Sequence, residues 1–475
     1  MRGDAPSVPC PLRAAALAAP EAAAIIGARG TISYGDLDAQ VSAAATRLGG
    51  LEPGSRVALL LPKDERYAIL LLALIRAGHV ACPISDRFPA KGVARLLERA
   101  ACRALISENE RLLQVLDEDI AGLRPETVLE GNEHTDRTGP ADLPIERPAT
   151  IVFTSGSMGV PKAALHAFGN HYRNALGSNA NIALRPGDRW LHSLPLYHVG
   201  GLSILFRCLL AGATVALPRR GATLGEAIAG LGATHVSLVS TQLSRLLRED
   251  AELDSLKAVL MGGGPIPGSL VDDAVARGLP IHTSYGLTEM ASQVTTTPPG
   301  ASREELRTSG RILSGREVSV SGEGEILVRG ETLFAGYVEG RKSDRPLDED
   351  GWFHTGDLGE LDEDGYLRVL GRRDNLFVSG GENIHPEEIE DVLCRLDGVE
   401  EAVVVPVPDQ EFGARPVAFV RTETGEVGDP TPELERVLPR FKIPTAFHPW
   451  PEGAIGMKAD RVALAERARQ LGARG

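Results

Sequence analysis

Five short segments of the sequence carry residue types that could bind a nucleotide. The first, Thr154–Lys162 (TSGSMGVPK), directly follows an apolar run with strand character. Hydroxyl groups and glycines at the end of a strand leave O–H and N–H donors open to an anion, and a nearby lysine adds positive charge. This pattern is typical of a phosphate-binding loop. It is not a Walker A loop, because Gly156 and Gly159 are separated by two residues rather than four.

Two further segments place flat and polar groups after strands. In Leu260–Pro267, three glycines follow a strand, and their bare backbone lets a flat ligand come close. In Ser284–Glu289 (SYGLTE), an aromatic ring, a hydroxyl group and a carboxylate lie within six residues. These groups can stack on a base, bind a phosphate oxygen and hold a hard cation, respectively.

The last two segments lie further along the chain. Asp357, at the end of Gly351–Asp357, can accept hydrogen bonds from two ribose hydroxyls, although an Asp in a glycine-rich turn is more often a local cap. The segment Gly371–Pro386 lies at a change of composition that indicates a domain boundary. Taken singly, any of these segments is also consistent with an ordinary loop that binds nothing.

The elements that must position these segments are strands and helices in alternation. Over the first two-thirds of the chain, short β-rich runs alternate with helical stretches, which predicts parallel sheets with helices on both faces. Ligands bind such sheets at the carboxyl ends of the strands. The expected strands are 56–61, 80–83, 150–154, 213–217, 235–239 and 258–261.

The residue composition and the lengths of the expected strands change twice toward the C-terminus. After about Gly310 the strands shorten and Gly, Asp and Glu become frequent, which predicts a β-rich subdomain. The last hundred or so residues predict a small α+β domain with helices over 386–396 and 462–471. We therefore expect an α/β protein with a large N-terminal domain of stacked βα sheets (1–371), a hinge (372–376) and a small mobile α+β C-terminal domain (377–475).

Composition excludes several classes of protein. The chain has 475 residues, a formal net charge of −14 and five scattered cysteines without a C-x-x-C pair. The acidic balance does not suit non-specific nucleic-acid binding, and the cysteines argue against a disulfide scaffold or a zinc site. The most apolar run, Tyr67–Leu74, is shorter than the roughly 20 residues that cross a bilayer. We expect a cytoplasmic protein with no membrane span and no nucleic-acid partner.

Together and in this order, the five segments resemble the adenylate-forming superfamily, which includes acyl-CoA synthetases, peptide-synthetase adenylation domains and luciferases. The resemblance covers nearly the whole chain. It implies an AMP-binding N-terminal domain and a C-terminal domain that supplies a catalytic lysine and turns about Asp374. It also implies ATP, Mg²⁺ and CoA: a carboxylate attacks the α-phosphate of ATP, and the thiol of CoA then displaces AMP.

The resemblance also assigns the ATP-binding residues. Thr288 would meet the α-phosphate, Glu289 would hold Mg²⁺, and Asp357 and Arg372 would hold the ribose hydroxyls. The adenine would lie among Gly263, Gly264, Pro265, Ser284, Tyr285 and Gly286. The β- and γ-phosphates would lie against Thr154, Ser155, Gly156, Ser157, Gly159 and Lys162.

Lys458 is the candidate for the catalytic lysine, since it is the only lysine after Lys442. By the resemblance it contacts the substrate carboxylate and the α-phosphate. The sequence departs from the family pattern in two places, the phosphate-binding loop and the segment before this lysine. Met158 stands where the family loop usually carries Thr or Ser, and one residue separates Gly456 from Lys458, where the family usually has Gly directly before Lys.

Two segments, 194–207 and 234–247, resemble the o-succinylbenzoate–CoA ligases of menaquinone biosynthesis. Arg207 lies in an otherwise apolar helix, where an arginine rarely lacks a partner. The resemblance implies that it pairs with the aromatic carboxylate of the substrate while the aliphatic carboxylate is activated. Ser237 and Gln242 would add polar contacts, and His198 would gate the site or contact the reacting carboxylate. An internal ion pair for Arg207 and a purely structural role for His198 remain the alternatives.

Other functions stay open on the sequence alone. The same chemistry could serve a fatty or aryl acid, or load a carrier protein instead of CoA. A nucleotide-binding protein without turnover is a third alternative. The expected partners are a small carboxylate, ATP and CoA, and the sequence leaves a homo-oligomer open.

Overall fold

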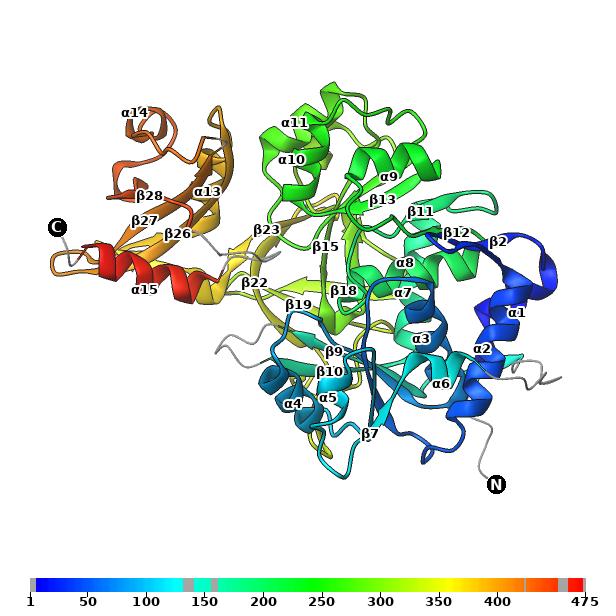
Figure 1. Cartoon of the computed structure of the whole chain (residues 1–475). Coiled ribbons are helices and arrows are strands. Elements are labelled where there is room, and N and C mark those ends of the chain that lie inside the picture. Colours follow the sequence, from blue (N-terminus) through cyan, green and yellow to red (C-terminus); the bar gives the residue numbers. More distant parts are fainter. Residues whose placement is uncertain (1–5, 131–140, 155–160, 423, 452–459, 473–475) are drawn as a thin grey trace.

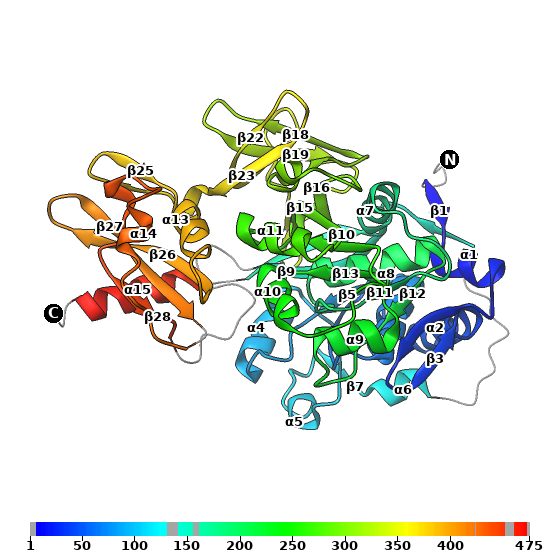
Figure 2. The ribbon, with the colours of Figure 1, turned by 90° about the horizontal axis from the view of Figure 1, so that it is seen from above.

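The computed structural model describes residues 6–130, 141–154, 161–422, 424–451 and 460–472. Two large sheets and a small four-stranded sheet form one body, and a separate α+β lobe stands beside it (Figures 1 and 2). The eight-stranded sheet runs β21 (Lys342–Asp344), β20 (Gly336–Glu339), β10 (Lys162–Ala167), β9 (Pro148–Thr154), β5 (Val80–Pro83), β4 (Arg56–Leu60), β6 (Ala104–Ser107), β7 (Ala121–Leu123).

The nine-stranded sheet carries most of the loops that concern function. Its order is β17 (Arg311–Ile312), β16 (Ser292–Thr296), β15 (Ile281–Leu287), β14 (Ala258–Met261), β13 (His235–Leu238), β11 (Arg189–Leu191), β12 (Thr214–Ala216), β2 (Ala23–Gly27), β3 (Gly30–Ser33). Strands β15, β14, β13, β11, β12 and β2 are parallel to one another. Their carboxyl ends therefore meet at one edge of the sheet, where ligands bind.

The eight-stranded sheet is antiparallel at one edge, and the nine-stranded sheet is antiparallel at both. Strands β10, β20 and β21 pair antiparallel in one sheet, and β16, β17 and β3 do so in the other. The expectation of parallel sheets is thus right for the centres of the sheets and wrong for these strands. The physical reason is that β9 and β10 are joined by a short connection, which forces a hairpin, whereas a parallel pair needs a long crossover.

Helices cover the sheets on both faces, as the alternation predicts. Their bounds are α1 (Pro11–Ala18), α2 (Tyr34–Leu48), α3 (Glu65–Ala77), α4 (Ala90–Arg99), α7 (Phe168–Asn181), α8 (Val199–Ala211), α9 (Leu224–Leu231), α10 (Ser240–Arg248) and α11 (Gly268–Ala276). Helix α3 shows how the sequence sets such bounds: the Asp64 carboxylate accepts from two backbone N–H groups, and Gly78 ends the helix in the left-handed conformation. No helix in the described part of the chain is long and apolar enough to cross a membrane.

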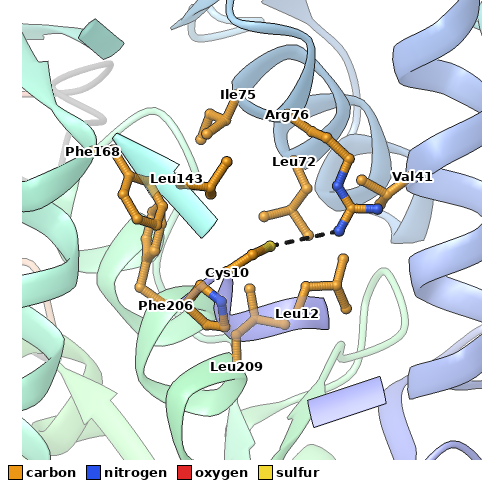
Figure 3. Close-up of a pocket in the computed structure, with 11 residues that line it drawn as sticks. Cys10, Leu12, Val41, Leu72, Ile75, Arg76, Leu143, Phe168, Phe206 and Leu209 are labelled. Carbon is orange, nitrogen blue, oxygen red and sulfur yellow. Dashed lines mark hydrogen bonds between the residues drawn. The ribbon is translucent and has the colours of Figure 1, made fainter. Parts of the chain in front are cut away.

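One continuous apolar core joins the two large sheets. It contains buried side chains of α2, α3, α7 and α8 together with strands of both sheets. A small cavity remains in this core between α1 and α3, with a volume of about 20 Å³ (Figure 3). Its walls are mostly apolar, and Cys10 and Arg76 contact each other across it at 3.7 Å. The space is on the order of one water molecule, so the cavity is a packing gap and not a ligand site.

The β-rich subdomain and the C-terminal lobe follow in chain order, as predicted. The subdomain is the sheet β18 (Arg316–Val320), β19 (Glu325–Gly330), β22 (Phe353–Leu361), β23 (Leu367–Arg372). The lobe contains β24 (Phe377–Ser379), β25 (Glu382–Ile384), α13 (Pro386–Leu393), β26 (Val399–Asp409), β27 (Gly413–Thr422), β28 (Phe447–Pro449) and α15 (Arg461–Gly472). The predicted fold class is confirmed.

Among the residues that the structure describes, two polar contacts connect the lobe to the large body. Arg248 at the end of α10 forms an ion pair with Glu400 at 2.8 Å. The backbone N–H of Gly268, at the start of α11, donates to Asp391 at 3.2 Å. These contacts are few and polar, which is typical of domains that move relative to each other.

Tyr34 gives the core a testable polar anchor. Its side chain is 1% exposed, and its hydroxyl lies 2.6 Å from the Ala213 carbonyl oxygen and 3.0 Å from that of Cys208. Tyr34→Phe leaves buried carbonyl groups without their donor, so we expect a loss of about 1–3 kcal/mol in unfolding free energy. Tyr172→Phe is the matched control, because no described residue bonds to that hydroxyl; equal denaturation midpoints for the two variants would contradict the prediction.

Candidate active site

The ends of β14 and β15 form one wall of the site. Ser284 donates from Oγ to the carbonyl oxygen of Met261 at 2.7 Å and so ties the two strand ends together. Gly262 lies against this contact, since a Cβ there would come within 2.8 Å of the Ser284 Oγ. Gly263 has a φ of +85°, which favours glycine. Gly264 has open space where a Cβ would be, so a flat ligand can approach this backbone.

A second group of residues joins the nine-stranded sheet to the β-rich subdomain. The Tyr285 hydroxyl donates to Asp357 Oδ2 at 2.6 Å, and Arg372 Nη1 donates to Asp357 Oδ1 at 3.0 Å. Asp357 and Arg372 face each other directly across β22 and β23. Burial and the Asp357 carboxylate raise the pKa of Tyr285 well above its ordinary value, so the phenol stays a donor at neutral pH. Arg372 also contacts Asp374 at 3.4 Å.

A third group lies where the eight-stranded sheet approaches β15. Tyr337, on β20, donates a short hydrogen bond from its hydroxyl to Glu289 Oε1. Lys162, at the start of β10, places its Nζ 4.9 Å from the centroid of the Tyr337 ring, a distance typical of a cation–π contact. Burial and the Glu289 charge raise the pKa of Tyr337. Tyr337 therefore contacts both the carboxylate and the lysine that were predicted to bind the metal and the phosphates.

His166 fixes the backbone next to Glu289. It is fully buried on β10, and its Nε2 lies 2.7 Å from the carbonyl oxygen of Thr288. A carbonyl oxygen only accepts, so Nε2 carries the hydrogen. Burial lowers the pKa of His166 to about 4, and the ring is neutral near pH 7. The hydrogen bond holds the Thr288 backbone against β10.

Sequence reasoning missed Tyr337 and His166. His166 lies four residues after Lys162, and Tyr337 lies in the segment Gly336–Val338. Neither position in the sequence shows which residue the side chain contacts. Arg372 connects the groups, because its charge acts on the pKa of both Tyr285 and Tyr337. The structure thus connects Lys162 and Glu289 through Tyr337, and Asp357 through Arg372, while their roles toward a nucleotide stay predictions.

Several predicted residues are placed only in part. Thr154 pairs with Lys162 across β9 and β10, and Gly286 lies close to the Ser292 backbone. The exposed Pro265 accepts a hydrogen bond at its carbonyl oxygen from Ser240 at 2.6 Å. Ser155, Gly156, Ser157, Met158, Gly159, Gly456 and Lys458 lie outside the described residues.

Arg207 lies on the predicted apolar helix, α8, with a side chain that is 1% exposed. Its Nη2 donates to Gln293 Oε1 at 2.6 Å, and its guanidinium lies 5.0 Å from the centroid of the Trp190 ring. The expected alternative, an ion pair with Asp or Glu, is not found for Arg207 among the described residues. Its Nε is buried and has no hydrogen-bond partner in that same part of the chain.

A second buried arginine lies close to Arg207. Arg316 donates to the carbonyl oxygens of Gln293, Ser314 and Asn174. Burial, followed by the charge of Arg316, lowers the pKa of Arg207 to about 9, so Arg207 remains charged near pH 7. Two buried positive charges around one neutral glutamine favour an anion at this place. Sequence reasoning missed Arg316 and Gln293, which lie far from Arg207 in the chain.

The other predicted substrate residues are placed around the same strands. Ser237 Oγ accepts from Trp190 Nε1 at 3.1 Å. Gln242 Oε1 accepts from the Val239 backbone at 3.1 Å and so caps α10. His198 is exposed and precedes α8, with its ring 4.8 Å from that of Tyr197. Ser237 therefore contacts Trp190 and Gln242 caps α10, and the roles of both residues toward a substrate stay predictions.

The residues present fit a magnesium ion held mainly by its nucleotide. Mg²⁺ prefers oxygen ligands and is usually held by one or two carboxylates together with substrate phosphates. Glu289 offers such a carboxylate, steadied by Tyr337. No group of three or more His, Cys, Asp or Glu side chains that could hold a metal occurs among the described residues.

Comparison with known proteins places the chain in a family. The sequence matches the family of AMP-binding enzymes over residues 12–338, and the AMP-binding enzyme C-terminal domain over residues 388–449. This chain belongs to the AMP-binding enzyme family. The predicted resemblance to adenylate-forming enzymes is confirmed.

Named relatives of this AMP-binding enzyme act on one acid. It is 35% identical over 452 residues to the 2-succinylbenzoate–CoA ligase of Bacillus pumilus, covering 90% of this chain and 91% of the relative. It is 34% identical over 429 residues to the enzyme of the same name from Listeria monocytogenes, covering 88% and 90% of the two chains. The similarity thus extends over nearly the full length of both proteins.

Solved structures of related AMP-binding enzymes agree with this fold. The o-succinylbenzoate CoA synthetase (MenE) of Bacillus subtilis with the acyl-adenylate intermediate OSB-AMP has a TM-score of 0.87 and 30% identity, covering 97% of this chain and 98% of that one. The same enzyme with ATP and a magnesium ion has a TM-score of 0.84 and 31% identity, covering 93% and 96%. A point variant of E. coli MenE with bound OSB-AMS has a TM-score of 0.85 and 32% identity, covering 98% of this chain and 99% of that one.

The hydrogen bond from Tyr337 to Glu289 makes a kinetic prediction. Tyr337→Phe removes the donor but keeps the ring beside Lys162. A hydrogen bond to a charged group contributes about 1.5–3 kcal/mol, so we expect kcat/KM for ATP to fall by roughly 10- to 150-fold, with a higher Mg²⁺ requirement. The measurement is initial rate against Mg²⁺ concentration at fixed ATP.

Tyr366→Phe is the matched control for Tyr337→Phe. The Tyr366 hydroxyl also donates to a carboxylate, that of Glu305, which is not one of the predicted site residues. Wild-type Mg²⁺ dependence in Tyr337→Phe would show that Tyr337 does not position Glu289.

Proposed function

We propose that this chain is an ATP-dependent acid–thiol ligase that converts o-succinylbenzoate to its CoA thioester. In the first half-reaction an oxygen of the aliphatic carboxylate attacks the α-phosphorus of ATP, and pyrophosphate leaves. In the second, the CoA thiolate attacks the acyl carbonyl carbon, and AMP leaves. The observation that supports this acid is Arg207, a buried cation without a carboxylate partner among the described residues.

The first half-reaction must bring two anions together. Lys162 offers a positive charge at the start of β10, opposite the end of β9, and Arg372 offers another beside Asp357. Mg²⁺, when bound at Glu289, supplies further positive charge to the phosphates. Preorganised contacts of this kind each contribute about 10²–10³ in rate. Thr288 contributes a hydroxyl at the α-phosphate in this proposal, on a backbone that His166 holds in place.

The nucleoside half of ATP fits the two other groups of residues. The ribose hydroxyls donate to Asp357, whose two carboxylate oxygens already accept from Tyr285 and Arg372. A carboxylate has about four acceptor positions, so two remain for the ribose. The adenine lies against Gly263, Gly264 and Tyr285 in this proposal.

Arg207 recognises the second carboxylate of the acid. An aromatic carboxylate can accept from the buried Nε and from a second N–H of the same guanidinium in the bidentate geometry that arginine favours. Gln293 accepts from Nη2 of this guanidinium, and the nearby Arg316 adds a second positive charge that favours an anion. A monocarboxylic acid would leave Arg207 buried and unpaired, which is costly. Because only an acid with a second carboxylate pairs with Arg207, a dicarboxylic substrate is favoured over a fatty or simple aryl acid.

The C-terminal lobe serves the second half-reaction in this proposal. We divide the chain into an AMP-binding domain (1–371), a hinge (372–376) with Asp374, and a catalytic-lysine domain (377–475). Gly380 and Gly381 both have positive φ in the β24–β25 hairpin, and this hairpin replaces Lys458 at the site when the lobe turns. The few polar contacts between lobe and body favour such a rotation.

We also propose that the enzyme is cytoplasmic. All five cysteines are free, with four of them buried, which fits the reducing cytoplasm. A homo-oligomer stays a prediction.

Arg207→Ala tests the acid. We expect the apparent affinity for o-succinylbenzoate to fall by about 2–5 kcal/mol, as for other truncated buried charge pairs, while KM for ATP stays near the wild-type value. Arg207→Lys keeps the charge but loses the planar guanidinium group. Its KM for the acid should therefore lie between those of the wild type and Arg207→Ala. The measurement is pyrophosphate exchange with o-succinylbenzoate and a panel of monocarboxylic acids. Preference of the wild type for a monocarboxylate would refute this substrate.

Lys458→Ala tests the division of labour between the half-reactions. We expect adenylate formation to fall by about 10²–10³, while thioester formation from supplied acyl-adenylate and CoA keeps its rate. Lys442→Ala is the control, since this lysine of the same lobe pairs with Glu388. Equal loss of both half-reactions in Lys458→Ala would assign that residue another role. If CoA fails to accept the acyl group but a carrier protein accepts it, the enzyme is instead a free-standing carrier-loading enzyme.

A further inference from the structure

A second polar pocket lies at the opposite edge of the nine-stranded sheet. It has a volume of about 290 Å³. Its lining comprises Ile182, Ala183, Arg185, Asp188, His235, Lys257, Ala258, His282 and Pro299. Apart from Pro299, which follows β16, these residues precede or begin β11, β13, β14 and β15, whereas the active-site loops follow the other ends of the same strands. Strand β14 has four residues and connects the two sites. At roughly 3.3 Å per residue, the sites are therefore separated by about the length of this strand.

His282 lines this pocket and has one ring nitrogen without a hydrogen-bond partner among the described residues. Its side chain is 4% exposed, and its Nδ1 lies 2.9 Å from the carbonyl oxygen of Thr297. The carbonyl can only accept, so Nδ1 donates and the neutral ring carries its lone pair on Nε2. No described residue bonds to that Nε2. Burial lowers the pKa of His282, which keeps the ring neutral and Nε2 an acceptor.

The neighbouring His235 differs, because both of its nitrogens are occupied. Nε2 lies 3.1 Å from the carbonyl oxygen of Ala183, and Nδ1 lies 2.8 Å from the Thr234 hydroxyl. His235 therefore forms the wall of the pocket. Of the two buried imidazoles, His282 is the one with capacity left for a ligand.

The pocket carries an excess of positive charge. Lys257 pairs with the buried Asp188 at 2.6 Å, and that carboxylate also accepts from the Arg185 backbone. Arg185 itself is exposed, and its guanidinium has no ion pair within the described part of the chain. Because both imidazoles are neutral, the charged groups of the pocket are the cations of Arg185 and Lys257 and the carboxylate of Asp188. Ile182, Ala258 and Pro299 add apolar surface beside these charges.

We propose that this pocket is a second binding site, for a small oxyanion that carries a hydroxyl group. The oxyanion accepts hydrogen bonds from Arg185 and Lys257, and the hydroxyl donates to His282 Nε2. Both monohydrogen phosphate and a small hydroxycarboxylic acid have this chemistry. The site is independent of the ligase reaction, since it shares no residue with the nucleotide or acid sites.

Binding can be followed at the imidazole that would contact the ligand. The full-length protein, labelled with ¹³C at histidine, is titrated with inorganic phosphate in one arm and with glycolate in the other. We expect a saturable shift of the His282 resonance, assigned from its loss in His282→Gln, together with a rise in the thermal unfolding midpoint. Saturation by phosphate alone or by glycolate alone identifies the source of the oxyanion; no saturable shift in either arm overturns the proposal.

Charge variants separate this site from general salt effects. Arg185→Gln and Lys257→Gln should each weaken binding roughly tenfold or more, because each removes a hydrogen bond to a charged group. Arg341→Gln is the matched control, since that arginine is also exposed and lies in the turn between β20 and β21, in the other large sheet's hairpin. The shift in unfolding midpoint needs no resonance assignment, so it remains informative if His282→Gln fails to fold. Equal midpoint shifts in Arg185→Gln and Arg341→Gln would overturn the proposal.

Discussion

The contact on which the rest of the site depends is the shared Asp357 carboxylate. Tyr285 reaches it from the end of β15, and Arg372 reaches it from β23. The contact therefore joins the nine-stranded sheet to the β-rich subdomain at the place where both border the nucleotide region. Because Tyr285 is buried and keeps its proton, the carboxylate is held from one side by a neutral donor and from the other by a cation. A ribose that binds there meets acceptors that are already oriented.

The same principle of support by a neighbouring sheet recurs at Glu289. This carboxylate lies at the end of β15, but its orientation is set by Tyr337 on the eight-stranded sheet, and its backbone follows a carbonyl held by His166. Neither residue needs to touch the nucleotide. Groups that must meet a developing charge act best when they do not reorient during the reaction, and these two hydrogen bonds limit such reorientation. The two large sheets thus meet at the site as well as in the core.

The sequence predicts the fold class, the order of the parts and the five motif segments, because these depend on local patterns. The strand Ala258–Met261 was predicted to the residue, since a buried apolar run is bounded there by a lysine and three glycines. Contacts between distant segments were not predictable. Tyr337 and Glu289 are 48 residues apart in the chain, and Arg207 and Gln293 are 86 apart. The antiparallel edge strands were missed for the same reason, because pairing direction depends on how distant segments meet.

Arg207 shows why an unexplained buried charge is informative. Its guanidinium is removed from water, and the described part of the chain gives it a glutamine and an aromatic ring rather than a carboxylate. Replacing such a charge by an apolar side chain is often neutral or stabilising for a fold, so stability alone does not account for an arginine here. Arg316 adds a second buried positive charge and lowers the pKa of Arg207 rather than raising it. An arrangement that disfavours its own charge in the free protein gains most from an anion that arrives from outside, and a second substrate carboxylate is such an anion.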